Sequence, residues 1–196
     1  MSDSIKVGLY FGSFNPIHTG HLSLAKYLVE HRIVDEVWFV VSPNNPLKSE
    51  KGLLNHQLRF DMVKLAVKDN PSFKVCDVEF SMPVPSYTID TLHLLRQTYP
   101  DIDFTLLIGS DNALVFDKWK NYQDILKEFP VLVYPRKGYD FKEVEAKFLQ
   151  MKLLDTPFYD ISSTEIRKRI VGNEDYSVYV TPEVEEFIKE NNLYKG

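Results

Sequence analysis

Cysteine and long apolar runs are scarce in this sequence. Among 196 residues there is one cysteine, Cys76, which excludes an intramolecular disulfide framework and is typical of a reducing compartment. The chain has no run of about 18 apolar residues, as a membrane-spanning helix would need. Its first residues also lack an apolar stretch behind a basic start, which is the pattern of a secretory signal. We therefore expect a cytoplasmic protein that contacts no membrane.

Positive charge is in deficit as well. The chain carries 23 Lys plus Arg against 28 Asp plus Glu, a formal net charge of -5. This balance argues against bulk electrostatic binding to nucleic acid, so we expect no nucleic-acid partner. Hydrophobic residues at 44% and charged residues at 26% are ordinary for a globular domain. The length predicts a single domain over residues 1–196, large enough to bury a core without disulfides.

Strand-like and helix-like segments alternate along most of the chain. Apolar, β-prone runs predict strands at residues 5–11, 37–41, 74–80, 104–108 and 131–134. Amphipathic spacing predicts a first helix at 21–32. A second helix is expected to begin after Asn55 as its N-cap and to face inward with Leu58, Met62, Leu65 and Ala66. A third is expected to begin at Thr88 as its N-cap and to reach an inward-facing Tyr99. This alternation predicts an α/β fold: a Rossmann-like, doubly wound, mostly parallel sheet with helices on both faces.

The end of the chain has a different pattern. Residues 162–171 and 182–191 predict two helices with no strand between them, so we expect a small helical C-terminal extension over about 161–196 on a core over about 1–160. The charged stretch at 142–147 predicts a solvent-facing helix surface. In doubly wound sheets ligands bind at the carboxyl ends of the strands. The segments that follow strands are therefore the place to look for a site.

The segment after the first predicted strand is G-S-F-N-P-I-H-T-G-H, residues 12–21. Gly12 and Ser13 are small and allow a tight turn whose backbone N–H groups can meet a phosphate. His18 and His21 are three residues apart, so both imidazoles can lie on one side of a helix N-terminus. There they could donate hydrogen bonds to a phosphoryl group as it is transferred. Gly20, between them, would let a ligand approach the backbone closely.

Two other interpretations apply to this pair of histidines. An isolated H-x-G-H is more often a pair of surface or capping histidines, but its position directly after the first strand of an α/β pattern favours phosphate chemistry. A zinc site would need Cys76 as a third ligand, and Cys76 lies inside a predicted strand with no paired ligand nearby. We therefore predict no metal site built from protein side chains.

Two further segments could hold phosphates. In I-S-S-T-E-I-R, residues 161–167, Ser162 or Ser163 can cap the following helix, and the exposed N–H groups, hydroxyls and Arg167 together could cradle a polyphosphate. A plain helix cap is the alternative. Lys48 follows the loop after the second strand and can reach phosphates at the same sheet edge, the alternative being a surface lysine.

Both phosphate segments resemble one enzyme superfamily. Residues 12–21 resemble the G-G-x-F-D-P-x-H-x-G-H signature of the nucleotidyltransferases of the H-x-G-H superfamily, with Asn15 in place of the aspartate, and residues 161–167 resemble its I-S-S-T-x-I-R motif. The resemblance implies that His18, His21, Lys48 and Arg167 act in catalysis. It implies an ATP-binding set of Gly12, Ser13, Phe14, His18, His21, Ile108, Gly109, Asp111, Arg136, Ser162, Ser163, Thr164 and Arg167.

Three more segments narrow the resemblance to the nicotinate-nucleotide adenylyltransferases: P-N-N-P at 43–46, P-S-Y-T-I-D-T-L at 85–92 and F-D-K-W at 116–119. With the phosphate motifs they span residues 8–170. The resemblance implies that Thr88 meets a carboxylate and Trp119 stacks on a pyridine ring. A plain helix cap and a half-buried core tryptophan are the alternatives. The implied acceptor-binding set is Asn44, Asn45, Lys48, Ser86, Tyr87, Thr88 and Trp119.

The implied reaction joins ATP and nicotinate mononucleotide to give nicotinate adenine dinucleotide and pyrophosphate, a step of pyridine nucleotide (NAD) biosynthesis. Mg²⁺ would accompany ATP, held by the phosphates and water. A related enzyme acting on nicotinamide mononucleotide or phosphopantetheine is one alternative. A nucleotide-binding sensor or scaffold without chemistry is another. Whether the chain forms a homo-oligomer is left open by the sequence.

Overall fold

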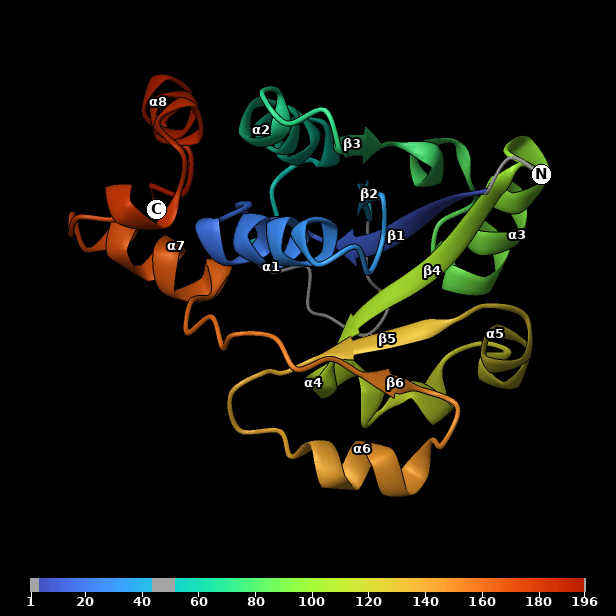
Figure 1. The fold of residues 1–196 in the computed structure, drawn as a ribbon. Coiled ribbons are helices and arrows are strands. Elements are labelled where there is room, and N and C mark those ends of the chain that lie inside the picture. Colours follow the sequence, from blue (N-terminus) through green and yellow to red (C-terminus); the bar gives the residue numbers. More distant parts are fainter. Residues whose placement is uncertain (1–3, 44–51, 196) are drawn as a thin grey trace.

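The computed structural model describes residues 4–43 and 52–195. A six-stranded sheet with the order β3-β2-β1-β4-β5-β6 lies at the centre (Figure 1), and all neighbouring strands run parallel. This sheet confirms the predicted doubly wound α/β fold. The strands are β1 (Ile5–Gly12), β2 (Glu36–Val41), β3 (Phe73–Cys76), β4 (Ile102–Gly109), β5 (Val131–Tyr134) and β6 (Lys152–Leu153).

Helices connect successive strands and cover both faces of the sheet. The α-helices are α1 (Thr19–Glu30), α2 (His56–Val67), α3 (Thr88–Thr98), α4 (Ser110–Ala113), α5 (Tyr122–Glu128), α6 (Phe141–Lys147), α7 (Ser163–Val171) and α8 (Pro182–Glu190). Short 3-10 helices are η1 (Val78–Ser81), η2 (Phe116–Lys118) and η3 (Ser177–Tyr179). In the described chain, no helix has the length and apolar character to cross a membrane.

Alternation along the strands divides the core in two. Tyr10 of β1 and Phe39 of β2 belong to one buried cluster, together with residues of α1, α2, α7 and α8. Leu9 of β1 and Trp38 of β2 belong to the other, together with residues of α3, α4, α5 and α6. Successive residues thus enter opposite layers because side chains in a strand alternate between faces. The apolar runs of β1 and β2 are the kind expected of strands buried on both faces.

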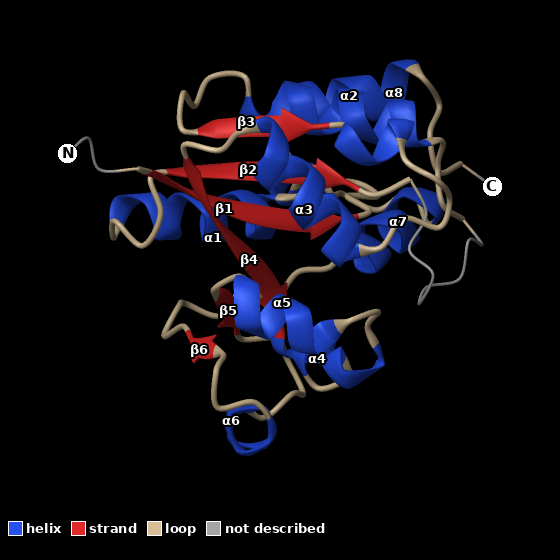
Figure 2. Ribbon diagram, turned by 90° about the vertical axis from the view of Figure 1, so that its right-hand side faces the viewer, coloured by secondary structure: helices blue, strands red, loops and turns tan. Residues whose placement is uncertain are grey.

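The strand order places the site. Chain connections leave β1 in one direction towards β2 and β3 and in the other towards β4, β5 and β6, so the sheet changes direction between β1 and β4. A crevice for ligands lies at the carboxyl ends of the strands at such a point. Figure 2 shows the arrowheads of β1, β2 and β3 pointing to one edge, the side on which α7 lies. Gly12 and Gly109 end β1 and β4 there.

The two helices α7 and α8 follow β6 without a further strand, as predicted. Figure 1 shows α8 beside α2. Their buried side chains, among them Ile166 and Val184, join the cluster of α1 and α2. The charged stretch at 142–147 forms most of α6 and is exposed except for Val144, as expected.

Three local predictions were wrong. The strand expected at 74–80 ends at Cys76, and η1 follows, because the Phe80 N–H turns back to donate to the Asp77 carbonyl at 2.8 Å. Thr88 is the first residue of α3; its N-cap is Tyr87, which makes no side-chain capping bond. Tyr99 follows the end of α3 and is 42% exposed, its ring resting edge-on against Trp38 at the rim of the core.

The inward face of α2 also differs from the prediction. Asn55 caps this helix as expected, accepting from the Gln57 N–H at 2.8 Å. Of the four positions predicted to face inward, Met62 is buried and Leu58, Leu65 and Ala66 are half-buried. The fully inward face is turned towards Arg59, Val63 and Val67.

Candidate active site

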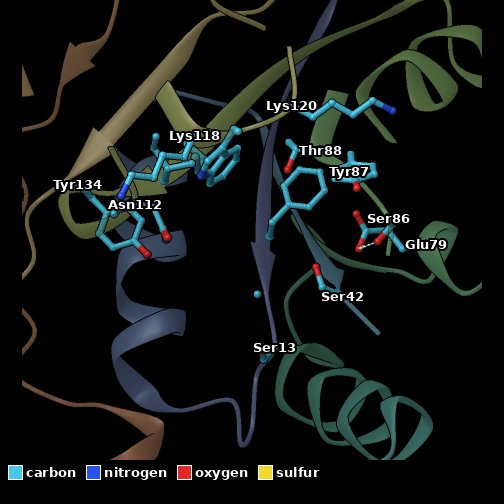
Figure 3. A pocket seen from close by; sticks show the side chains of 16 residues that line it. Ser13, Ser42, Glu79, Ser86, Tyr87, Thr88, Asn112, Lys118, Lys120 and Tyr134 are labelled. Carbon is cyan, nitrogen blue, oxygen red and sulfur yellow. Dashed lines mark hydrogen bonds between the residues drawn. The ribbon is translucent and has the colours of Figure 1, made fainter. Parts of the chain in front are cut away.

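Two adjoining cavities lie at the crevice between β1 and β4. They share one wall, which is made of Phe11, Gly12, Ser13, Asn112 and Tyr134. One, called here the aromatic cavity (Figure 3), is completed by Ser42, Glu79, Ser86, Tyr87, Thr88, Leu107, Ile108, Gly109, Lys118, Trp119 and Lys120. The other, called the histidine cavity, is completed by Tyr10, Phe14, Asn15, His18, His21, Leu53, Asp111, Arg136, Ser162, Ser163, Thr164 and Arg167.

His18 and His21 meet at the start of α1. His18 is the N-cap, with extended backbone, and its N–H donates to Nδ1 of His21 at 3.3 Å. The two rings stack with their centroids 3.6 Å apart. His18 is 3% exposed, and its Nδ1 is buried with no partner in the described chain.

The His18 ring is a neutral hydrogen-bond donor at physiological pH. Burial, and secondarily the positive charge of Arg136, lower the pKa of His18 to about 3. A neutral imidazole still carries one N–H, so it can donate one hydrogen bond without being a cation. It lies beside the N-terminus of α1, where backbone N–H groups favour negative charge. An anion can therefore be bound here without a charged histidine.

Two glycines of the site leave room for neighbouring side chains of the site. A Cβ on Gly20 would lie 2.4 Å from Cγ2 of Ile161 and 3.1 Å from Nδ1 of His18. A Cβ on Gly109 would lie 2.4 Å from Oδ1 of Asp111. The expected role of Gly20, close approach of a ligand, is therefore wrong: the room is taken by Ile161 and His18. Both glycines let distant segments pack closely around the histidine cavity.

The two phosphate segments interlock although about 150 residues separate them. Arg167 of α7 donates from Nη1 to the Asn15 carbonyl at 2.7 Å and from Nη2 to Oγ1 of Thr164 at 3.2 Å. The Ser163 hydroxyl donates to the Pro16 carbonyl at 2.8 Å. Ser162 caps α7, accepting from the Glu165 N–H at 3.2 Å. The start of α7 is therefore fixed against the loop that follows β1.

Asn15 is a site residue that the sequence did not single out. Its Nδ2 donates to the Gly52 carbonyl at 2.9 Å. Its Oδ1 accepts from the Leu54 N–H at 3.3 Å and from the Tyr194 hydroxyl at 3.0 Å. An aspartate could not donate to Gly52, which gives a physical reason for an amide at this position. The only signal in the sequence was the departure from the signature.

Arg59 was also missed, and it joins the loops that follow β1 and β2. Its side chain is fully buried and donates to four carbonyls at 2.6–2.9 Å, those of Ser13, Ser42, Pro43 and Leu54. None of the described acidic side chains forms an ion pair with it. Burial lowers the pKa of Arg59 to about 10, so it stays charged at neutral pH. An arginine on the inward face of an amphipathic helix was the available signal.

Asp111 and Arg136 stand at the ends of β4 and β5. Arg136 Nε lies 3.8 Å from Oδ1 of Asp111, and the Arg136 N–H donates to the Ser110 hydroxyl at 2.9 Å. With Ser162 they also border a third, open cavity, lined further by Tyr139, Tyr159 and Arg169 among others. The histidine cavity therefore continues sideways past these two charged groups.

The aromatic cavity is bordered by the ring of Trp119 and by the N-terminus of α3. Trp119 is half-buried against Phe116, with ring centroids 4.9 Å apart, and its Nε1 is buried with no partner in the described chain. Thr88 begins α3, so the free N–H groups of that helix lie at the cavity. Lys120 places Nζ 4.5 Å from the Tyr87 ring centroid and 2.9 Å from Oδ2 of Asp90.

Glu79 is a buried acid in the same cavity. It is 3% exposed and accepts from the hydroxyls of Thr91 at 2.8 Å and Ser86 at 3.0 Å, the latter bond drawn in Figure 3. Burial raises the pKa of Glu79. It ties η1 to α3 and so fixes the loop that carries Ser86. The sequence contained no signal for it, since Glu79 lies within the run expected to be a strand.

The structure brings most of the predicted site residues together. Ile108 and Gly109, expected to contact ATP, line the aromatic cavity. Asn44, Asn45 and Lys48 lie outside the described residues. The remaining predicted ATP contacts line the histidine cavity: Gly12, Ser13, Phe14, His18, His21, Asp111, Arg136, Ser162, Ser163, Thr164 and Arg167. The remaining predicted acceptor contacts line the aromatic cavity: Ser86, Tyr87, Thr88 and Trp119.

A site built from protein ligands for a metal is not found in residues 4–43 and 52–195, where no three His, Cys, Asp or Glu side chains are grouped suitably. Burial raises the pKa of Cys76 to about 11, so its thiol stays protonated and is a poor ligand. The donors around the histidine cavity are the guanidinium groups of Arg136 and Arg167, hydroxyls and N–H groups, which suit phosphate oxygens.

Comparisons with known proteins agree with this geometry. Residues 9–169 match the family model described as cytidylyltransferase-like. A Flavobacterium johnsoniae protein is 43% identical over 97% of this chain and 100% of its own length, and one from Bacteroides thetaiotaomicron is 44% identical over 96% and 93%; both carry the name "Probable nicotinate-nucleotide adenylyltransferase". The Plasmodium falciparum nicotinic acid mononucleotide adenylyltransferase, solved in complex with NaAD, has the same fold, with a TM-score of 0.82, 23% identity and 97% of both chains covered.

Proposed function

Because this chain belongs to the cytidylyltransferase-like family, and within it to the nicotinate-nucleotide adenylyltransferases, we propose that it transfers the adenylyl group of ATP to nicotinate mononucleotide. The products are nicotinate adenine dinucleotide and pyrophosphate, in NAD biosynthesis. The observation that carries the proposal is the wall shared by the two cavities. A cavity lined by cations and helix N-termini adjoins one lined by aromatic rings, as a reaction between a triphosphate and a pyridine nucleotide requires.

ATP occupies the histidine cavity in this proposal. Its phosphates lie against the N-termini of α1 and α7, where backbone N–H groups and Arg167 can bind them. His18 and His21 donate to the α-phosphate as it is transferred. The adenosine lies past Asp111 and Arg136, towards the open side cavity.

Nicotinate mononucleotide occupies the aromatic cavity. Its pyridine ring stacks on Trp119, a half-buried ring that faces this space. Its carboxylate accepts from the free N–H groups at the start of α3, beside Thr88, where the helix dipole favours an anion. Lys120 also lines this cavity, where its Nζ is paired with Oδ2 of Asp90 at 2.9 Å.

The chemistry requires no protein nucleophile. A 5′-phosphate oxygen of the acceptor attacks the α-phosphorus of ATP, the bond from that phosphorus to the bridging oxygen breaks, and pyrophosphate leaves with both electrons. The attacking oxygen is already an anion near neutral pH, so no base is needed. The protein holds the two phosphates in line and stabilises the charge that spreads over the transferred group. His18, His21 and Arg167 supply donors for that charge, and Lys48 is proposed to join them.

Mg²⁺ fits this site as a companion of ATP. The described side chains offer no acidic cluster to hold it, so ATP phosphates and water would be its main ligands. When bound it neutralises phosphate charge. We propose that the partners of the protein are these small nucleotides and not nucleic acid. We also propose that the reaction takes place in the cytoplasm.

The test is release of pyrophosphate with ATP and each of three acceptors: nicotinate mononucleotide, nicotinamide mononucleotide and phosphopantetheine. We expect the highest kcat/KM with nicotinate mononucleotide. A preference for the amide by more than tenfold would contradict the acceptor assignment. Binding of ATP without pyrophosphate release from any acceptor would identify a nucleotide sensor instead.

A further inference from the structure

Tyr134 occupies the wall between the two cavities. It is the last residue of β5 and pairs in register with Gly109, which ends β4. Its half-buried side chain lines both the aromatic and the histidine cavity. Figure 3 shows its ring near the labelled Asn112, across the cavity from Tyr87 and Ser86. A group that passes from a ligand in one cavity to a ligand in the other must pass beside this wall.

The hydroxyl of Tyr134 is oriented by a second tyrosine. The Tyr10 hydroxyl donates to the Tyr134 hydroxyl at 3.2 Å. Tyr10 is 3% exposed, and its ring packs edge-on against Phe14 and His21, with centroids 5.7 Å away in each case. A phenol has one proton, which it can donate, and lone pairs that accept. Since Tyr134 accepts from Tyr10, its own proton is left for another acceptor.

Both phenols keep their protons at physiological pH. Burial raises the pKa of Tyr10 and the pKa of Tyr134. The pair therefore acts as a chain of neutral donors that starts at a rigid, buried ring and ends at the shared wall. Neutral donors placed where charge develops stabilise a transition state at little reorganisation cost.

We propose that Tyr134 is a further catalytic residue, whose hydroxyl donates a hydrogen bond to the phosphoryl group in transfer, and that Tyr10 is the positioning residue that aims it. The inference rests on the proposed adenylyl transfer and deepens it. No proton changes hands: the Tyr134 O–H stays intact, and its hydrogen bond strengthens as charge grows on the non-bridging oxygens of the α-phosphate. Tyr134 thereby joins His18 and His21 on the reacting group.

The experiment compares Tyr134→Phe, Tyr10→Phe and the double variant in the pyrophosphate-release assay. Each change removes one oxygen and keeps the ring. For Tyr134→Phe we expect kcat to fall about 10- to 100-fold, less than for a sole transition-state donor because the two histidines remain. Both KM values should change less than about threefold, since the donor acts mainly in the transition state. Tyr10→Phe should lower kcat less, and the double variant should match Tyr134→Phe, because Tyr10 acts through Tyr134.

Tyr27→Phe is the matched control. Its hydroxyl donates to the Asp155 carbonyl at 2.9 Å, away from both cavities, so its removal should leave kcat unchanged. A Tyr134→Phe variant with wild-type kcat would overturn the inference while leaving the adenylyl transfer intact. Fully additive losses in the double variant would overturn the positioning role of Tyr10. Absence of pyrophosphate release from the wild-type chain would instead overturn the proposed function.

Discussion

The histidine cavity and the aromatic cavity are held together in different ways. Beside the first, Arg167 and Ser163 of α7 bind the carbonyls of Asn15 and Pro16 in the loop after β1. Beside the second, the Glu79 carboxylate accepts from the hydroxyls of Ser86 and Thr91 and so joins η1 to α3. We assign the first side to the phosphates of ATP and the second to the acceptor. Substitutions beside the histidine cavity should therefore lower kcat, whereas substitutions beside the aromatic cavity should raise the KM for the acceptor.

The largest expected effect is on the histidine side. His18→Ala removes a proposed donor to the transferred phosphate, and kcat should fall at least about 100-fold. Binding of ATP, measured by calorimetry, should weaken only modestly, and the acceptor KM should hold. His31→Ala is the control, because His31 lies just beyond the other end of α1 and stacks on Tyr27. Unchanged turnover in His18→Ala would contradict the assignment of phosphoryl transfer to the histidine cavity.

Arg59 tests the wall that the cavities share. Arg59→Met leaves the carbonyls of Ser13, Ser42, Pro43 and Leu54 without their buried donor, and we expect the free energy of unfolding to drop by about 3 kcal/mol. Urea denaturation measures this drop. KM should rise for both substrates, since Ser13 lines both cavities.

Arg59→Lys separates the charge of Arg59 from its hydrogen bonds. A lysine keeps the charge but cannot present the planar guanidinium fork, so it should recover less than half of the lost stability. Full recovery with lysine would mean that charge, and not the four hydrogen bonds, holds the two loops.

Trp119 sharpens the comparison from the aromatic side. Trp119→Ala removes the ring proposed to stack on the pyridine, and the acceptor KM should rise about tenfold, the equivalent of one stacking contact. The KM for ATP should change little. Trp119→Phe should restore most of the acceptor affinity. A rise confined to the KM for ATP would reverse the assignment of the two cavities.

Acid should lower the stability of the folded protein in the absence of substrates, because His18 resists protonation in the folded state. The pKa of His18 is lowered from 6.5 to about 3 in the folded protein. As pH falls from about 6.5 towards 3, the unfolded chain takes up a proton that the folded chain refuses, so the folded state loses stability. Glu79 opposes this loss, because its raised pKa lets the folded chain take up its proton first.

Thermal unfolding of the wild type and of His18→Gln across this pH range isolates the histidine contribution. The Tm of the variant should fall less steeply between pH 6.5 and pH 4 than that of the wild type. Equal slopes would show that His18 is not held neutral by burial.

The parts of the site that the sequence predicts are carried by short, continuous segments. The loop with His18 and His21 and the segment with Ser162 and Arg167 are continuous motifs, and α/β alternation places them at one sheet edge. The fold followed from the same alternation, because parallel buried strands need apolar runs joined by amphipathic helices. β6, with two residues, was too short to leave a pattern.

The missed residues depend on tertiary contacts. Arg59, Asn15 and Glu79 act through partners up to 179 residues away along the chain, as for Asn15 and Tyr194. A buried charge satisfied by main-chain carbonyls leaves no periodic signal. A ligand was expected beside Gly20, but Ile161, which is far along the chain, fills that room.

The most direct test is an experimental structure with nicotinate adenine dinucleotide bound. We predict one continuous ligand across the shared wall, with the pyridine ring on Trp119, the adenosine beside Asp111 and Arg136, and the diphosphate within hydrogen-bond distance of His18 and Tyr134. A dinucleotide with its pyridine ring outside the aromatic cavity would contradict it.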